Sequence, residues 1–311
     1  MTNEVKSPFV IATVLNHNGW MDAAECVRSL LSSSYANLKI VVIDNCSTDN
    51  SVNELTKLVG GNRVQLVQTG ANLGSVGGTA FAARYALKSK ADFIFALSND
   101  LAVQPDTIEI LVNAMLSDPG LGVLSPKIMY YRRPDRIWSC GFVMNHWLAR
   151  GTDLVKRVER CPHNAEMLDV DMLVGAVMFL RRELVEQVGF LDERYFFQNE
   201  EYEFFDRIKK AGWRVKVAMN TSVLHKVGQT IGTESYDRWY YGTRNRLLYI
   251  RESLPLLQRI TAKSFFYGTR PIKFCRWLFK GKPDLIRATF DGWRDYRRCK
   301  LGKRLSTGDV G

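Results

Sequence analysis

A polar triplet that contains a carboxylate follows one of the most apolar runs in the chain. The run Phe93–Leu97 has the length and the aromatic and β-branched content of a strand buried on both faces, and Ser98-Asn99-Asp100 comes directly after it. In open α/β sheets, ligands bind outside the carboxyl ends of the strands. We therefore predict that Asp100 holds a divalent metal ion, which in turn holds a diphosphate. A simple strand-ending turn is the alternative, because Ser, Asn and Asp are also good turn residues.

Three more polar loops follow apolar runs in the first half of the chain. The runs 9–15, 38–43 and 64–68 are predicted strands, and helices are predicted over 20–33, over 51–59 and up to about Lys88. This alternation predicts a parallel sheet with helices on both faces. The loops that begin near Asn16, Asp44, Asn72 and Asp100 would then meet at one sheet edge, which strengthens the ligand-binding interpretation.

These loops carry recognisable motifs. The segments VLNHNG (14–19), VVIDNCSTDNS (41–51), ANLGSVGG (71–78) and LSNDL (97–101) occur in an order and spacing that resemble glycosyltransferase family 2, above all its bacterial rhamnosyltransferase-type branch. The resemblance covers roughly residues 8–250. It implies an α/β, GT-A-type fold with a mostly parallel central sheet that binds a nucleotide-sugar.

The resemblance also implies roles for individual residues. Asp44 matches the aspartate that contacts the nucleotide base, and Asp100 matches the carboxylate that binds Mg²⁺ or Mn²⁺, although Ser98 departs from the usual Asp or Asn. One carboxylate with diphosphate oxygens and waters is enough for a hard cation. The expected donor-binding residues are Leu15, Asn16, Asn18, Asp44, Ser47, Asn72, Gly74, Gly77, Ser98 and Asn99.

An acidic segment in the second half is the candidate for general-base catalysis. Glu200, Glu201 and Glu203 stand where the family has Glu-Asp-x-Asp at a helix start, so Glu replaces both Asp residues. The resemblance places the catalytic base at Glu201, with Glu200 as the second candidate. The structural alternative is that carboxylates in the first turn are simply favoured by the helix dipole.

Two further positions acquire roles from the resemblance. A last strand is predicted over 215–217, and Val223-Leu224-His225 follows it. A lone histidine is more often structural than a ligand, but the family places a second metal ligand at the position of His225. Arg244 lies in a segment that either packs the end of the catalytic domain or contacts the diphosphate, since Arg suits bidentate phosphate recognition.

The acceptor half contains a second acidic motif. Asp169 and Asp171 form a D-x-D, but they precede an apolar run instead of following one, so we predict that Asp171 lies near the acceptor and not on the metal. Gly175 and Ala176 interrupt that run and would allow close packing against the acceptor. Residues 130–135 are polar and are expected to form an irregular surface excursion.

The positive charge is concentrated in the C-terminal tail. The chain has a net charge of +11, and residues 251–304 carry 15 Lys/Arg and 4 Asp/Glu, which accounts for the whole excess. Aromatic and aliphatic residues alternate with these cations, as in amphipathic helices that lie on an anionic membrane surface. The alternatives are a helical subdomain that packs on the catalytic body, or a contact between copies in a homo-oligomer.

Composition sets the expected organisation and location. We expect a catalytic domain over 1–250, with a nucleotide-binding half (8–126) and an acceptor half (127–250), then the basic helical tail (251–304) and a disordered end (305–311). No apolar run approaches the ~20 residues of a membrane span, and the N-terminus lacks a signal-peptide pattern. The scattered cysteines suit a reducing cytoplasm. These features predict a protein on the cytoplasmic face of the plasma membrane.

The expected activity is that of an inverting, metal-dependent glycosyltransferase. It would move a sugar to a saccharide or lipid-linked acceptor in cell-surface polysaccharide synthesis. The resemblance favours dTDP-rhamnose as donor, with UDP-hexoses or a UDP-furanose as the alternatives. One rival is a sugar nucleotidyltransferase, but the sequence lacks an early Gly-rich, Lys-containing phosphate loop. The other rival is a binding protein with a degraded site that docks on an anionic membrane or on nucleic acid. A basic tail on a neutral body indicates a local docking surface, so we expect no nucleic-acid partner.

Overall fold

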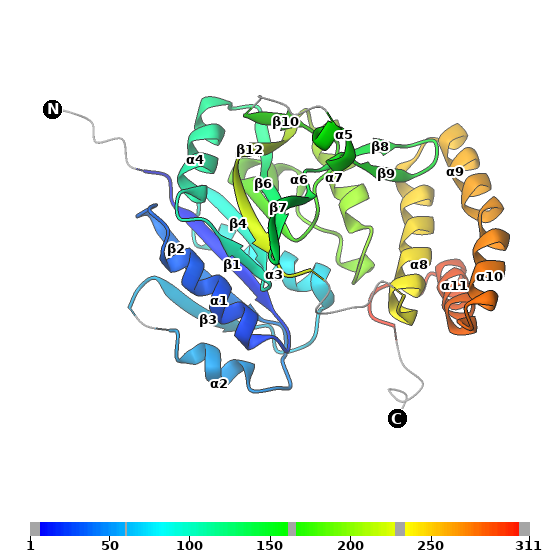
Figure 1. The fold of residues 1–311 in the computed structure, drawn as a ribbon, viewed down its shortest axis with the longest axis horizontal. Helices are drawn as coiled ribbons and strands as arrows, with labels where there is room; N and C mark the ends of the chain where they lie inside the picture. Colours follow the sequence, from blue (N-terminus) through cyan, green and yellow to red (C-terminus); the bar gives the residue numbers. More distant parts are fainter. Residues whose placement is uncertain (1–6, 60, 161–165, 228–233, 305–311) are drawn as a thin grey trace.

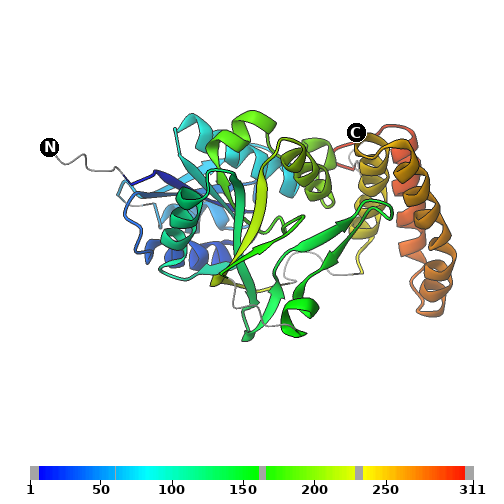
Figure 2. The same ribbon diagram turned by 90° about the horizontal axis from the view of Figure 1, so that it is seen from above.

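The structure is a computed structural model that describes residues 7–59, 61–160, 166–227 and 234–304. A central sheet with helices on both faces occupies residues 10–225, and a group of C-terminal helices stands beside it (Figures 1 and 2). The mixed α/β class, with a mostly parallel central sheet and C-terminal helices, is confirmed. The predicted disordered end, 305–311, lies outside the described residues.

The first four strands of the sheet are parallel neighbours. β1 (Val10–Asn16), β2 (Leu38–Asp44), β3 (Val64–Gln68) and β4 (Phe93–Ser98) lie in the order β4-β1-β2-β3. The register pairs Asn16 with Asp44 and Leu15 with Ser98, so the strands end together. The predicted convergence of the polar loops at one edge is confirmed.

The second half completes the sheet with strands in both directions. β6 (Leu121–Tyr130) and β12 (Arg214–His225) run parallel to the first four strands, whereas β11 (Val177–Arg181) is antiparallel to both β4 and β6. β10 (Met167–Asp169) and β5 (Leu101–Val103) pair antiparallel with β12. A two-stranded sheet of β8 (Phe142–Asn145) and β9 (Arg150–Asp153) lies apart.

Two sequence predictions about this half were wrong. Residues 130–135 are not an irregular excursion, because β6 and β7 (Arg133–Ser139) pair as an antiparallel hairpin across them. The last strand does not end at Val217, since β12 continues to His225 and pairs with β5 along its second part. Both strands contain polar residues that interrupt the apolar pattern used to predict strands. Edge and bulged strands tolerate such residues, because they do not require continuous apolar runs.

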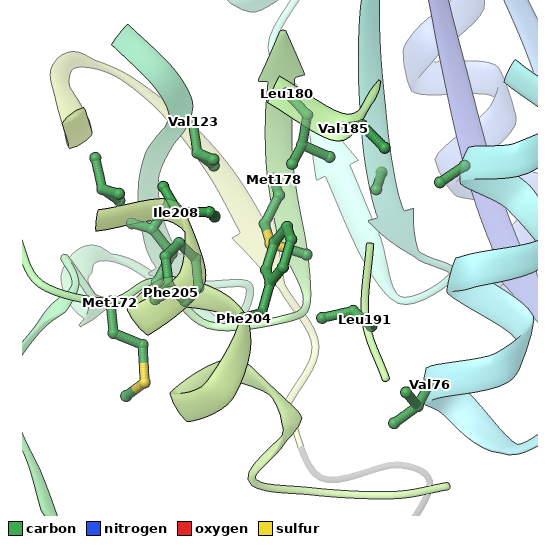
Figure 3. Packing of buried hydrophobic residues seen from close by; sticks show 14 of the residues in the cluster. Val76, Val123, Met172, Met178, Leu180, Val185, Leu191, Phe204, Phe205 and Ile208 are labelled. Atoms are coloured by element: carbon green, nitrogen blue, oxygen red, sulfur yellow. The ribbon is translucent and has the colours of Figure 1, made fainter. Parts of the chain in front are cut away.

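Helices bury both faces of the sheet, as the continuous apolar strands predict. One core contains Ile11, Ile43 and Ile94 and packs against α3 (Gly74–Lys88), α6 (Arg182–Val188) and α7 (Glu200–Lys210). Figure 3 shows Phe204, Phe205 and Ile208 of α7 in this core. The other core packs against α1 (Trp20–Leu31) and α4 (Thr107–Ser117). The remaining short helices are α2 (Ser51–Thr56), α5 (Val155–Arg160) and the 3₁₀ turn η1 (Glu193–Tyr195).

The C-terminal helices form a compact group around α8 (Tyr236–Ser253). α9 (Leu256–Gly268), α10 (Arg270–Phe279) and α11 (Pro283–Arg297) follow, and α11 packs along α8 (Figure 1). Tyr240 of α8 donates a hydrogen bond of 2.8 Å to Asp295 of α11, and Tyr236 bonds Asp291. Throughout the described residues, every helix is too short or too polar to span a bilayer.

Gly292 permits the close approach of α11 to α8. A Cβ atom at this position would lie 2.4 Å from the carbonyl oxygen of Tyr240, which is backbone and cannot rotate away. We expect Gly292→Ala to lower the free energy of unfolding by about 1–3 kcal/mol, because the two helices must separate. Denaturant unfolding followed by circular dichroism measures this.

Gly268 provides the matched control for that substitution. A Cβ atom on Gly268, at the end of α9, would meet no atom within 4 Å. Gly268→Ala should therefore be neutral or raise the free energy of unfolding by about 0.4–1 kcal/mol, because Ala restricts the unfolded chain. Equal behaviour of the two variants would contradict the assigned packing of α11 on α8.

Candidate functional site

A cavity of about 550 Å³ opens at the carboxyl ends of the parallel strands. We call it the edge cavity. Loops after β1, β2, β3 and β4 contribute to its wall, together with the end of β12, the segment after η1, the start of α8 and the end of the tail. The lining residues are Leu15, His17, Asn45, Asn72, Gly74, Ser75, Ser98, Asn99, Asp100, Ala176, Phe196, Phe197, His225, Asp237, Arg238, Tyr241, Lys303 and Arg304.

A hydrogen-bond network, buried at Asp44 and exposed at Asn18, joins the loops beside this cavity. Asp44 is 1% exposed, and its carboxylate accepts hydrogen bonds from Asn16 Nδ2 (3.1 Å) and from the Ser47 backbone N–H (3.0 Å). Asn18 Oδ1 in turn accepts from the backbone N–H of Thr48 at 2.7 Å. These expected donor residues therefore join the loops after β1 and β2, and they support the wall instead of lining it.

Asparagine side chains extend the network to the wall itself. Asn45 donates to the carbonyl of Gly74 at 3.0 Å and accepts from the Leu73 N–H at 3.0 Å. His17 lies between Asn45 and Asn72, with its ring nitrogens 3.0 Å from the Asn45 carbonyl and 3.2 Å from Asn72 Nδ2. Amides offer both donors and acceptors in a fixed plane, so these loops are held in one arrangement.

Asp100 and His225 meet in the edge cavity, although 125 positions separate them. Their side chains approach to 3.0 Å between Oδ2 and Nε2, and Ser98 Oγ donates to the other carboxylate oxygen at 2.7 Å. The contact follows from the β5–β12 register, which pairs His225 with Leu101. Burial opposes ionisation of Asp100, but the hydrogen bonds from His225 and Ser98 outweigh it and hold the pKa of Asp100 below its ordinary value.

This pair fits the requirements of a divalent cation. A carboxylate and an imidazole are both metal ligands, and 3.0 Å is close to the separation of neighbouring ligands around an ion at roughly 2.1 Å. Within the described residues, no group of three or more His, Cys, Asp and Glu side chains could enclose an ion. The remaining coordination positions would belong to other oxygen atoms, such as those of a bound diphosphate and of water.

A second cavity, of about 410 Å³, shares one lining residue, Arg238, with the edge cavity. We call it the Glu201 cavity, because Glu201 lines it beside aromatic residues and several cations. The full lining is Trp138, Phe142, Met172, Leu173, Val174, Gln198, Asn199, Glu201, Tyr202, Arg238, Trp239, Gly242, Thr243, Arg246, Arg270 and Lys273.

The two glutamates at the start of α7 have different surroundings. Glu201 accepts a hydrogen bond of 3.3 Å from the Gly175 N–H, and Ala176, the next residue, lines the edge cavity. Glu200 is 6% exposed, and its buried Oε2 has no partner among the described residues. Burial raises the pKa of Glu201, and burial together with repulsion from Glu201 raises the pKa of Glu200.

Some sequence-predicted residues lie elsewhere. Arg244 is fully buried and donates to the carbonyl oxygens of Gly302, Tyr195 and Arg194, so the structure shows the packing alternative and not a diphosphate contact. Asp171 is not brought to either cavity, because its carboxylate pairs with Lys209 and accepts from the Met144 N–H at 2.7 Å. Gly77 is buried inside α3 and lines neither cavity.

The sequence prediction missed several lining residues. His17 and Asn45 are each adjacent to a predicted residue, so the motif loops themselves could have indicated them. Lys303 and Arg304 gave no such signal, because the tail reaches the edge cavity only through tertiary packing. There Arg304 pairs with Asp237 at 3.0 Å, and its backbone N–H donates to Tyr241 Oη at 2.8 Å.

Comparisons with known proteins agree with this geometry. A profile described as glycosyl transferase family 2 matches residues 10–189, which include β1–β4, β11 and the Asp100 loop. An N-acetylglucosaminyl-diphospho-decaprenol L-rhamnosyltransferase of Mycobacterium tuberculosis is 28% identical over 232 residues, covering 67% of this chain and 73% of that protein. A hexosyltransferase of low-salt glycan biosynthesis, Agl10 of Haloferax volcanii, is 25% identical over 275 residues, which are 84% of this chain and 83% of that protein.

Solved structures share the fold. A mannosyltransferase from Pyrobaculum calidifontis in complex with GDP-Man and Mn²⁺ aligns with a TM-score of 0.55 at 16% identity, over 95% of this chain and 87% of that one. GalNAc-T7 with UDP, GalNAc and Mn²⁺ aligns with a TM-score of 0.61 at 14% identity, over 88% of this chain, which spans 58% of that structure.

Proposed function

Since this chain belongs to glycosyltransferase family 2, and is therefore an enzyme that takes its sugar from a nucleotide-sugar, we propose where its two substrates bind. The nucleotide-sugar donor binds in the edge cavity and the acceptor in the Glu201 cavity. One observation carries this assignment: Arg238 lines both cavities, with the Asp100–His225 pair in one and Glu201 in the other. Two substrates placed there would face each other across a single boundary.

The edge cavity offers suitable groups for a nucleoside diphosphate. Phe196, Phe197 and Tyr241 provide aromatic faces, and the amides of the asparagine network provide hydrogen bonds. Lys303 and Arg304 add positive charge at the same wall. Asp100 and His225 would hold a divalent cation, Mg²⁺ or Mn²⁺, which would neutralise charge on the leaving diphosphate.

Glu201 is the proposed general base. It would accept the proton of the acceptor hydroxyl as that oxygen forms a bond to the anomeric carbon. The bond from this carbon to the diphosphate oxygen breaks on the opposite side, and its electron pair leaves with the diphosphate, so the configuration inverts. The bond to the Gly175 N–H fixes the Glu201 carboxylate at the boundary, where Ala176 already faces the donor side.

The names of the relatives support a more specific proposal for the donor sugar and the acceptor. The mycobacterial relative is named as an N-acetylglucosaminyl-diphospho-decaprenol L-rhamnosyltransferase, and the archaeal relative as a hexosyltransferase of low-salt glycan biosynthesis. We propose rhamnose as the transferred sugar and a lipid-linked saccharide as acceptor, in cell-surface polysaccharide synthesis. Family membership favours this activity over a nucleotidyltransferase or a binding protein with a degraded site.

We propose that the enzyme lies on a membrane surface, and exposed apolar side chains support this. On α10, Ile272, Leu278 and Phe279 are 75%, 60% and 93% exposed, and Leu256 and Leu257 on α9 are 67% and 68% exposed. The exposed cations Arg276 and Lys280 lie among them. This combination suits the cytoplasmic face of the plasma membrane, where anionic headgroups attract Lys and Arg.

Membrane binding can be tested with vesicles. We expect the full chain to sediment with vesicles that contain anionic phospholipid, and the double variant Ile272→Ser/Phe279→Ser to remain mostly in the supernatant. Leu116→Ser is the matched control, because Leu116 is 53% exposed but lies on α4. Equal sedimentation of all three proteins would reject the proposed surface.

The metal site can be tested by calorimetry. Asp100→Asn should weaken Mn²⁺-dependent binding of the nucleotide-sugar, because a neutral amide is a poorer metal ligand than a carboxylate. Loss of a residue that only supports a metal ligand typically costs roughly 10–100-fold in affinity, and loss of the ligand itself should cost at least as much. Asp106→Asn, an exposed change at the start of α4, should bind as the unaltered chain does. Unchanged Mn²⁺ dependence in Asp100→Asn would contradict the metal site proposed at Asp100 and His225.

The general base can be tested by turnover. Glu201→Gln should keep donor binding and lower kcat by roughly 10²–10⁴, because the amide cannot accept the proton. Glu183→Gln, in the exposed first turn of α6, should leave kcat unchanged. A large loss in Glu200→Gln but not in Glu201→Gln would transfer the role to Glu200.

The pH profile gives an independent readout of the same base. Burial raises the pKa of Glu201, so activity should fall on acidification at a higher pH than the ordinary Glu pKa of about 4.3. Glu200→Gln should retain this acid limb, because burial and repulsion from Glu201 keep Glu200 protonated in the pH range where Glu201 titrates. The other charged groups of the cavity, Arg238, Arg246, Arg270 and Lys273, are unchanged in that comparison.

A further inference from the structure

The Glu201 cavity contains an excess of positive charge that the described part of the chain does not neutralise. Arg238, Arg246, Arg270 and Lys273 line it against the single carboxylate of Glu201. Arg270 is 8% exposed, and its Nε and Nη1 have no hydrogen-bond partner among the described residues. Buried charges are costly unless they are paired, so such a cluster requires an explanation.

Stacking on aromatic rings explains only part of the arrangement. The Arg270 guanidinium lies 3.8 Å from the Phe266 ring centre, and Lys273 Nζ lies 4.9 Å from that of Trp239. Arg246 donates one bond, of 2.7 Å, to the Leu148 carbonyl, while its Nε has no partner among the described residues. Stacking occupies the faces of these cations, whereas their N–H groups remain available to an oxyanion.

We propose that Arg246, Arg270 and Lys273 bind the diphosphate group of a lipid-linked acceptor in the Glu201 cavity. This assignment rests on the proposed function, because Glu201 identifies the cavity as the acceptor side. A diphosphate diester carries two negative charges, which suits three cations better than a phosphate diester, with its single charge, or a neutral sugar does. The donor diphosphate belongs to the edge cavity, beyond Arg238.

The position of these residues favours a lipid over free phosphate. Arg270 and Lys273 lie on α10, the helix that also exposes Ile272, Leu278 and Phe279. Trp138, Phe142 and Trp239 provide apolar lining in the same cavity. The C-terminal helices would thus hold the acceptor's diphosphate on one side and meet the membrane on another.

The probes are farnesyl diphosphate, inorganic pyrophosphate and farnesol, titrated into the full chain with EDTA present. EDTA removes divalent metal, so that the metal-dependent donor site does not compete for the probes. We expect both diphosphates to bind, farnesyl diphosphate more tightly, and farnesol to bind weakly. Equal affinity for pyrophosphate and farnesyl diphosphate would assign the cavity to free phosphate and overturn the lipid part of the proposal.

Substitutions on α10 test the residues. Arg270→Gln and Lys273→Gln should each weaken farnesyl diphosphate binding roughly tenfold or more, the usual effect of losing a charged hydrogen bond. Arg276→Gln removes the same charge from an exposed position on α10 and should change the affinity less than about twofold. Lys273 is only half-buried, so its variant remains informative if Arg270→Gln fails to fold. Unchanged binding in Lys273→Gln and in a folded Arg270→Gln would overturn the proposal.

The pH dependence adds a second readout. Burial, together with the charges of Arg270, Arg246 and Arg150, lowers the pKa of Lys273 to about 8. The affinity for farnesyl diphosphate should therefore fall as the pH rises through 8, and this fall should be smaller in Lys273→Gln. Arg238 and Glu201, which also line the cavity, are common to both proteins.

Donor binding separates this proposal from the proposed function. The α10 variants should keep the thermal stabilisation given by a nucleotide-sugar with Mn²⁺, because Arg270 and Lys273 do not line the edge cavity. If the unaltered chain binds farnesyl diphosphate but no nucleotide-sugar, the proposed function fails while the anion site stands. If it binds a nucleotide-sugar but not farnesyl diphosphate, only the anion site fails.

Discussion

The register of the central sheet is the constraint on which the site depends. β1, β2 and β4 end together, so the side chains that follow them meet at one edge. The antiparallel pairing of β5 with β12 then brings His225 beside Asp100, which lies 125 positions earlier in the sequence. A slip of one residue in that pairing would turn His225 to the other face of the sheet and separate the pair.

The C-terminal segment contributes residues to both cavities as well as to the proposed membrane-binding surface. α11 holds α8 through the close contact at Gly292, and α8 presents Arg238 and Tyr241 to the edge cavity. The end of the tail returns to the same cavity with Lys303 and Arg304, while α10 supplies Arg270 and Lys273 to the other. Part of the tail's positive charge therefore lines the two cavities, where the lower dielectric constant strengthens electrostatic interactions.

Much of the fold and part of the site could be predicted from the sequence. Buried parallel strands are continuous apolar runs, so β1 to β4 and the polar loops after them were readable, and with them Asp100 and Asn72. The pairing of His225 with Asp100 needed the family resemblance, because a strand with polar residues and a bulge gives no clear period. The buried role of Arg244 and the cations of the Glu201 cavity depend on long-range packing, which local patterns do not encode.

The most direct test of this account is ligand-induced thermal stabilisation of the full chain by a panel of nucleotide-sugars, with Mn²⁺ or with EDTA. The account predicts that one donor raises the unfolding temperature specifically, by the equivalent of roughly 2.7 kcal/mol at a free concentration of about a hundred times its Kd, and that EDTA abolishes the effect. A folded chain that no nucleotide-sugar stabilises would contradict donor binding in the edge cavity. Stabilisation that persists in EDTA would contradict the role assigned to Asp100 and His225.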